Sequence, residues 1–250
     1  DIIGGRNGTL QGDATASAPG LIGRCFRFDG TNDYVQIPDS PAFHLANLTV
    51  ECWVRFAAYQ TPGNTYYPNQ QYIIFKQNSR YDEFEGFVLT KDHDPQGDVF
   101  LWEVASAGGE LIRVDSVSTV VTGVWYHVAG VIKGTNAYIY LNGSRDAMKS
   151  FTGTPRSRPE PVKFAYLESW GYFPGLLDDV RIYNRALEPW EIWTLATTTI
   201  MDTDGDGLPD YFEDRNGNGV ADTGNGETDW LTSNSGLSGP AALQVFTPLK

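Results

Sequence analysis

The sequence is poor in the residues from which most metal and catalytic centres are built. Its 250 residues include two cysteines, two methionines and three histidines, and the cysteines and histidines are not spaced as zinc ligands are. No apolar run approaches the roughly 18 residues that cross a membrane, so we expect no membrane insertion. Basic residues are also few, with 18 lysines and arginines against 31 acidic residues and a net charge of −13. Because such a chain repels phosphate backbones, we expect no nucleic acid among its partners.

Motifs for covalent or hydrolytic catalysis are missing as well. The sequence has no Gly-x-Ser-x-Gly elbow, and a retaining glycosidase with a β-sandwich fold would need carboxylates in a Glu-x-Asp-x-x-Glu pattern. The nearest approach, Asp82-Glu83-Phe84-Glu85, has the wrong spacing. We therefore expect a protein that is not an enzyme. A signal peptide is also missing and the chain starts abruptly at Asp1, so we expect it to be a piece of a longer protein.

Short alternating segments that end in turns are abundant. The most regular segment covers residues 123–144, where aromatic and β-branched residues alternate with period two on both sides of a turn at residues 133–136. This pattern predicts a β-hairpin of long central strands. Similar segments recur between residues 24 and 183, and one short helix is predicted at residues 188–195, with Trp190 and Trp193 packed onto the strands. Many short strands with this spacing predict an all-β sandwich or jelly roll of two antiparallel sheets.

The two cysteines, Cys25 and Cys52, each fall within a predicted strand. One interpretation is two buried thiols that behave as small hydrophobic side chains. The other is a disulfide between neighbouring strands of a secreted protein. Strand patterns do not give the distance between the two residues, so both interpretations stay open at this point.

Five motifs follow one another along the chain: Phe28-Asp29-Gly30 with Asp33-Tyr34-Val35, and then residues 49–54, 125–129, 140–143 and 175–187. In this order they resemble the laminin G-like domains of the concanavalin A-like group. The resemblance covers about residues 5–197 and implies a jelly roll with one concave and one convex sheet. The chain departs from it at Cys25 and Cys52, where the family usually has small residues. This paired replacement favours the disulfide.

The sharpest metal signal is a twelve-residue acidic loop that starts at Asp202. Carboxylates stand at loop positions 1, 3, 5, 9 and 12, and Gly207 stands at position 6, where the chain must turn. These are the ligand positions of an EF-hand-type calcium loop. An incomplete second loop follows, and the two loops, over about residues 202–229, resemble the calcium repeats of thrombospondin type 3 regions; the alternative is a disordered acidic linker. The predicted ligands, with the carbonyl oxygens of Leu208 and Val220 among them, are Asp202, Asp204, Asp206, Leu208, Asp210, Glu213, Asp214, Asn216, Asn218, Val220, Asp222 and Glu227 or Asp229.

The laminin G-like resemblance also implies a structural calcium ion within the sandwich. It would lie where Asp178 meets the Asp29-Gly30 turn, with a carboxylate from Asp178 and mostly carbonyl oxygens from the turn. Asp33 and Asp179 are weaker candidates. The alternative is that Asp29 and Asp33 only cap the turn through hydrogen bonds. Calcium is therefore the cofactor that we expect, here and in the acidic loop.

Aromatic residues that the family motifs do not include are the candidates for ligand contacts. Aromatic faces stack on sugar rings, and polar side chains around them would fit a lectin-like site. The predicted ligand-binding residues are Trp102, Tyr81, Arg113, Trp170 and Tyr172.

The predicted organisation has three segments. Residues 1–198 form a laminin G-like jelly-roll domain, residues 199–232 a calcium-binding segment, and residues 233–250 a linker or the first strand of a following domain. The expected function is recognition of a carbohydrate or a surface glycoconjugate, or adhesion, by a non-catalytic module of a larger extracellular protein. Neighbouring domains of the same chain would be its other partners. Two alternatives stay open: a calcium-rigidified spacer without a ligand, and a carbohydrate-binding module attached to a glycoside hydrolase.

Overall fold

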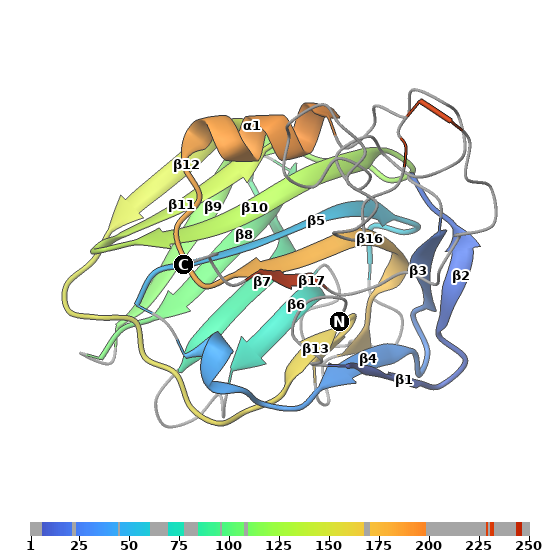
Figure 1. Ribbon diagram of the computed structural model, residues 1–250, viewed down its shortest axis with the longest axis horizontal. Helices are drawn as coiled ribbons and strands as arrows, with labels where there is room; N and C mark the ends of the chain where they lie inside the picture. The colour runs from blue at the N-terminus through green and yellow to red at the C-terminus, as the bar shows by residue number, and fades with distance from the viewer. Residues whose placement is uncertain are drawn as a thin grey trace.

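Two large antiparallel sheets lie face to face and enclose the core (Figure 1). The structure is a computed structural model that describes residues 7–21, 24–44, 46–60, 70–77, 85–95, 97–107, 110–167, 171–198, 229, 231–232 and 244–246. In spatial order, the strands of the seven-stranded sheet are β1 (Thr9–Gln11), β4 (Tyr34–Ile37), β13 (Val162–Phe164), β6 (Gln71–Gln77), β7 (Gly86–Asp94), β8 (Gly97–Ala105) and β9 (Leu111–Thr119).

The second sheet has eight strands. Their spatial order is β12 (Ser144–Ser150), β11 (Asn136–Leu141), β10 (Trp125–Lys133), β5 (Leu48–Phe56), β16 (Pro174–Tyr183), β3 (Arg24–Asp29) and β2 (Thr15–Pro19), and β17 (Gln244–Phe246) pairs in parallel with β16. A separate two-stranded sheet of β14 (Tyr166–Leu167) and β15 (Gly171–Tyr172) lies next to β6, and a 3-10 turn, η1, covers Pro41–Phe43. The sheets are built from strands far apart in sequence, so this is a jelly-roll-like sandwich.

Period-two alternation places the core between the two sheets. On β5, Val50, Cys52 and Val54 belong to the main buried cluster, whereas Glu51 and Trp53 alternate with them and point to the other face of the sheet. The predicted hairpin of residues 123–144 is confirmed as β10 and β11, which pair in antiparallel register from Val128 to Leu141. β10 also pairs with β5, so this hairpin lies inside the sheet and not at its edge.

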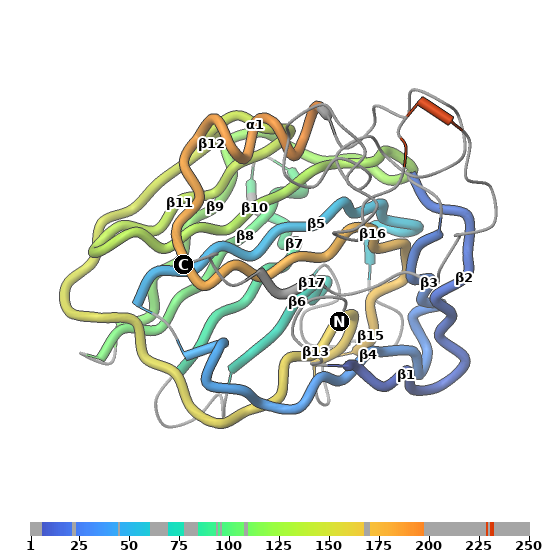
Figure 2. The backbone as a smooth tube through the Cα atoms, in the orientation of Figure 1, coloured from blue at the N-terminus to red at the C-terminus, as the bar shows by residue number. Residues whose placement is uncertain are grey.

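The one α-helix among the described residues, α1 (Pro189–Thr198), runs along the outer face of the eight-stranded sheet, as the tube in Figure 2 shows near β10 to β12. Pro189 stands in its first turn, and the Glu191 carboxylate accepts the Glu188 amide hydrogen at 2.8 Å, as in a capping box. The expectation that Trp190 and Trp193 pack onto the strands is wrong. They are 67% and 55% exposed, because the sheet-facing side of α1 is formed by residues such as Ile192.

The disulfide between Cys25 and Cys52 is also wrong, because both cysteines are free and buried. β16 lies between β3 and β5, so the two cysteines are separated by two inter-strand spacings, about 9.5 Å, whereas a disulfide needs Cα atoms within about 7 Å. Cys52 belongs to the core cluster and Cys25 does not; the Cys25 thiol donates to the Pro19 carbonyl. Burial raises the pKa of the Cys25 thiol to about 12.

Candidate functional site

A polar patch lies on the outer face of the seven-stranded sheet, across β7, β8 and β9. Antiparallel register sets Val88 opposite Glu103 and Glu103 opposite Arg113, so these three side chains share one face. Asp92 follows Val88 by four residues on β7 and reaches the same face. The sandwich core lies on the opposite face of these strands, where Trp102 is fully buried.

Arg113 is the centre of this patch, which we call the Arg113 patch and define by Gln70, Asp92, Glu103, Arg113 and Asp115. The Nη2 atom of Arg113 lies 3.1 Å from Oδ2 of Asp92, and its Nε atom lies 3.3 Å from Oε1 of Glu103. The Gln70 amide donates to the same Asp92 oxygen at 3.0 Å. The Arg113 side chain is nevertheless 45% exposed, so part of its guanidinium faces solvent.

The carboxyl group of Glu103 is held in an unusual protonation range. Its burial raises its pKa to about 7, against a lowering effect of Arg113 and with further raising by Asp92 and Asp115. Glu103 is therefore partly protonated near neutral pH, and it can either donate or accept a hydrogen bond there. Perturbed groups of this kind concentrate at functional sites, although ion-pair networks produce them too.

A second charged cluster lies on the outer face of the eight-stranded sheet and is almost completely buried. Arg181 donates from Nη1 to Glu51 at 2.9 Å and from Nη2 to Asp179 at 2.8 Å, and Nε2 of His127 lies 2.8 Å from the other Glu51 oxygen. Burial alone would raise the pKa of Glu51, but Arg181 and His127 hold it below its usual range. A register shift between Asp178 and Arg181, with Asp179 at a φ of 48°, turns Asp179 toward Arg181. This cluster holds β5, β10 and β16 together, and its Glu51, His127 and Arg181 side chains are out of reach of a ligand because they are fully buried.

The structure places the predicted ligand-binding residues in different environments. Arg113 is at the centre of the patch just described. Trp102 is not available to a ligand, because it is fully buried and packs in a tilted arrangement against the Phe87 ring, with 5.7 Å between the ring centroids. Tyr172 is half-buried and stacks on Tyr166 at 4.7 Å between ring centroids, at the small sheet of β14 and β15. Tyr81 and Trp170 lie outside the described residues.

The predicted calcium pair of Asp29 and Asp178 is not brought together. In the antiparallel register Pro174 lies opposite Asp29, and Asp178 is four residues further along β16, roughly 13 Å away. Asp178 instead accepts the backbone amide hydrogens of Leu21 and Asp179, at 2.9 Å each. The interpretation of a single site shared by Asp29 and Asp178 is therefore wrong.

Asp29 is part of a different acidic group. One carboxylate oxygen from each of Asp13, Asp29 and Asp33 lies within 4.8 Å of the others. Asp33 accepts the amide hydrogens of Asp13 and Asp29, and Asp29 accepts that of Thr31, so these carboxylates do cap their turn. Three hard oxygen donors in one place also suit calcium, which accepts several carboxylates in irregular geometry. The acidic loops of residues 202–229 lie outside the described residues, and their calcium sites stay predictions.

Sequence reasoning missed Asp92, Glu103 and Asp115. β7 continues to Asp94 and so brings Asp92 into the sheet. The available signal was alternation in residues 111–119, where Arg113 and Asp115 are charged residues two apart and so share one face of the strand. No described helix is long and apolar enough to span a membrane.

The fold and the patch define a class before any relative is considered: a jelly-roll sandwich of the concanavalin A-like type, with a polar patch on one sheet. The model of the family Laminin_G_3, described as the concanavalin A-like lectin/glucanases superfamily, matches residues 29–193. The chain belongs to this family. No curated protein matches it closely enough to count as a relative.

Solved structures with the same fold are remote in sequence. Domain 4 of AbnA, an extracellular arabinanase of Geobacillus stearothermophilus in complex with arabinotriose, is 18% identical with a TM-score of 0.57, over 76% of this chain and 88% of that one. The heptameric SAP-like pentraxin of Limulus polyphemus is 17% identical with a TM-score of 0.53, over 72% and 85%. The binding domain of botulinum neurotoxin DC in complex with SialylT is 11% identical with a TM-score of 0.57, over 80% and 48%. At these identities the likeness concerns the fold alone.

Proposed function

We propose that this chain is a non-catalytic carbohydrate-recognition module, and that the Arg113 patch is where it contacts sugar. The observation that carries the proposal is the position of Arg113, which is half-exposed and fixed by Asp92 and Glu103 from two neighbouring strands. Because the guanidinium is already held in place before the ligand arrives, less side-chain entropy is lost on binding.

The chemistry of the patch suits hydroxyl-rich ligands. Carboxylates accept from sugar hydroxyls, the outer edge of the guanidinium donates to them, and Glu103 can do either near neutral pH. Tyr72 donates to Gln70 at 2.8 Å, and Gln70 donates to Asp92, so the patch continues into an aromatic side chain. Few, well-placed polar groups beside an aromatic ring are typical of small-ligand sites.

The position of Arg113 between two carboxyl groups favours sugar recognition over sugar hydrolysis as the function of the patch. A glycosidase needs one carboxyl group to protonate the bond and a second carboxylate free to attack or to activate water. In this patch two of the three carboxyl groups, Asp92 and Glu103, are engaged by the same guanidinium. The fold neighbours support a sugar ligand as well, since arabinotriose and SialylT are named in complexes of two of them.

The proposal includes calcium and an extracellular location. Asp13, Asp29 and Asp33 would hold one ion with carboxylate oxygens, and the ion would offset their mutual repulsion. The acidic loops that start at Asp202 and Asp214 would hold further ions and stiffen the chain toward the next domain. The competing function is a calcium-rigidified spacer without a ligand.

The test is a glycan array probed with the wild-type fragment, Arg113→Ala and Lys149→Ala, each in calcium and in chelator. Lys149 is exposed on β12 of the other sheet, so its variant controls for the loss of one positive charge. We expect Arg113→Ala to weaken binding of the glycans retained by wild type at least about tenfold, or 1.4 kcal/mol, and Lys149→Ala to bind as wild type.

Thermal melting of each variant establishes that the fold is intact. If the wild-type protein binds no glycan in either buffer, the proposed carbohydrate recognition is contradicted and the calcium-rigidified spacer is favoured. Equal binding by wild type and Arg113→Ala would contradict the assignment of the patch.

A further inference from the structure

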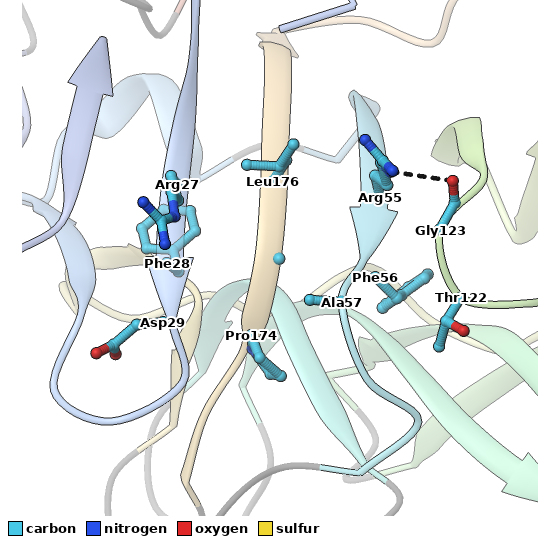
Figure 3. A pocket seen from close by; sticks show the side chains of 11 residues that line it. Arg27, Phe28, Asp29, Arg55, Phe56, Ala57, Thr122, Gly123, Pro174 and Leu176 are labelled. Atoms are coloured by element: carbon cyan, nitrogen blue, oxygen red, sulfur yellow. Dashed lines mark hydrogen bonds between the residues drawn. The ribbon is translucent and has the colours of Figure 1, made fainter. Parts of the chain in front are cut away.

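A hollow of about 440 Å³ opens on the outer face of the eight-stranded sheet, away from the Arg113 patch. Its walls come from the ends of β3, β5 and β16 and from the turn that precedes β10 (Figure 3). In Figure 3, Arg27 and Asp29 lie on one side of the strand that carries Pro174 and Leu176, and Arg55 and Thr122 lie on the other. The proposed function does not involve any of these residues as sugar contacts.

Two arginines lie on opposite sides of this hollow (Figure 3). Leu176 on β16 is opposite Arg27 on β3 and also opposite Arg55 on β5, so the three side chains stand abreast on one face. The Cα atoms of Arg27 and Arg55 are therefore about 9.5 Å apart, two inter-strand spacings. Arginine side chains can cover that gap from both sides and reach one shared group.

These two arginines differ from most others in the described part of the chain. Arg113, Arg156, Arg158, Arg181 and Arg185 all form ion pairs with carboxylates. Neither Arg27 nor Arg55 has an ion pair among the described residues, and both are exposed in a protein of net charge −13. Arg55 donates from Nε to the Gly123 carbonyl at 3.0 Å, which fixes its guanidinium and leaves its two terminal nitrogens for another acceptor.

The rest of the lining indicates the kind of anion. Pro174 and Leu176 supply an apolar floor, and the Thr122 hydroxyl and the Asp29 carboxylate offer hydrogen bonds at opposite walls. Asp29 shares its surroundings with Asp13 and Asp33, so the two guanidiniums are the positive groups among the residues that line the hollow. Two guanidiniums match the two oxygens of a single carboxylate. A densely sulfated or phosphorylated ligand would meet repulsion from Asp29 and from the acidic protein as a whole.

We propose that this hollow binds a carboxylated sugar, a uronic acid residue of an acidic oligosaccharide. Arg27 and Arg55 take the carboxylate from two sides, the geometry that guanidinium groups favour. The ring lies over Pro174 and Leu176, and Thr122 and Asp29 take its hydroxyl groups. The chain then has two sugar-binding faces, one on each sheet, with different ligand chemistry.

The experiment is a calorimetric titration of the wild-type fragment with trigalacturonate, with its methyl-esterified form and with inorganic sulfate. The variants are Arg27→Gln, Arg55→Gln and, as the matched control, Lys149→Gln. We expect trigalacturonate to bind, each of the two hollow variants to bind it at least about tenfold more weakly, and the control to bind it unchanged. Amide chemical shifts of Gly123 and Gly175 should move on titration, because both residues line the hollow.

Loss of the carboxylate charge in the methyl ester should abolish binding. Equal binding of ester and acid would overturn the proposal, as would absence of trigalacturonate binding or an equal loss in Lys149→Gln. Sulfate that binds as tightly as trigalacturonate would also overturn it, since the site would then recognise an anion without the sugar. Because Arg113 is unchanged in all these variants, failure here leaves the glycan-array result of the Arg113 patch unaffected.

Discussion

Arg181 and Glu51 form an ion pair from which water is excluded, with 2.9 Å between Nη1 and Oε1 and neither side chain exposed. The pair joins β16 to β5, and His127 joins β10 to the same carboxylate. Two central strand pairs of the eight-stranded sheet therefore depend on one Glu51 side chain. Buried pairs are weak evidence of net stabilisation, but the removal of one partner leaves a buried charge without compensation.

Arg181→Met should therefore lower the free energy of unfolding by about 3–5 kcal/mol. Urea unfolding followed by tryptophan fluorescence measures the change. Lys133→Met is the matched variant, because Lys133 and Glu188 form a pair at the surface, with side chains about half exposed. It should leave the midpoint unchanged, and an equally small effect of Arg181→Met would contradict the role given to the buried pair.

The raised pKa of Glu103 predicts that the stability of the folded protein depends on pH. Its pKa is about 7 in the folded protein and near 4.5 in the unfolded chain, so the folded state binds more protons between these values. The free energy of unfolding should fall by about 3 kcal/mol at most as the pH rises from 4.5 to 7, and it should level off above pH 7. Glu103→Gln should remove this slope and be more stable than wild type above pH 7. Urea unfolding at a series of pH values measures it.

The control for this slope is Glu110→Gln, on an exposed residue next to a turn. It should follow the wild-type curve over the whole range. Parallel curves for wild type and Glu103→Gln would show that the carboxyl group of Glu103 titrates as in the unfolded chain.

Gly130 and Trp102 pack so closely that no side chain fits between the sheets at this point. A Cβ atom on Gly130 would lie 2.3 Å from Cδ2 of the Trp102 ring, and both residues are in the interior. Gly130→Ala should therefore destabilise the protein by about 1–3 kcal/mol through overpacking. Thermal melting compares it with Gly134→Asn, at a turn with a φ of 60° and no atom near the added Cβ, where the change should be smaller. A larger loss of thermal stability in Gly134→Asn than in Gly130→Ala would contradict this prediction, because Trp102 would then move aside to make room for the added Cβ atom.

Calcium removal separates the two predicted kinds of metal site. Calorimetric titration of the chelator-treated fragment should show calcium bound, with at least one equivalent lost in Asp204→Ala with Glu213→Ala. A separate loss is expected in Asp29→Asn with Asp33→Asn, whose carboxylates belong to the group of Asp13, Asp29 and Asp33. Equal stoichiometry in wild type and both double variants would place any calcium elsewhere.

Local patterns in the sequence determined the strands. The hairpin of β10 and β11 could be predicted because period-two alternation and a turn signal lie within about twenty residues of each other. Alternation was less informative on β8, where both faces are buried: Leu101 is as fully buried on the outer face as Trp102 is on the inner one. In a strand with two buried faces, the sequence pattern does not show on which face an aromatic side chain lies. Trp102 was therefore assigned to a ligand site, and Glu103 was missed.

What the sequence by itself determined was the all-β sandwich, its family motifs and the acidic composition, because these follow from residue types and short-range spacing. The tertiary structure alone decided which side chains meet. Insertion of β16 between β3 and β5 separates Cys25 from Cys52 and, on the same principle, sets Arg27 and Arg55 on either side of Leu176. Strand order in a sheet depends on long-range pairing, and a period-two pattern is the same whichever neighbour a strand receives.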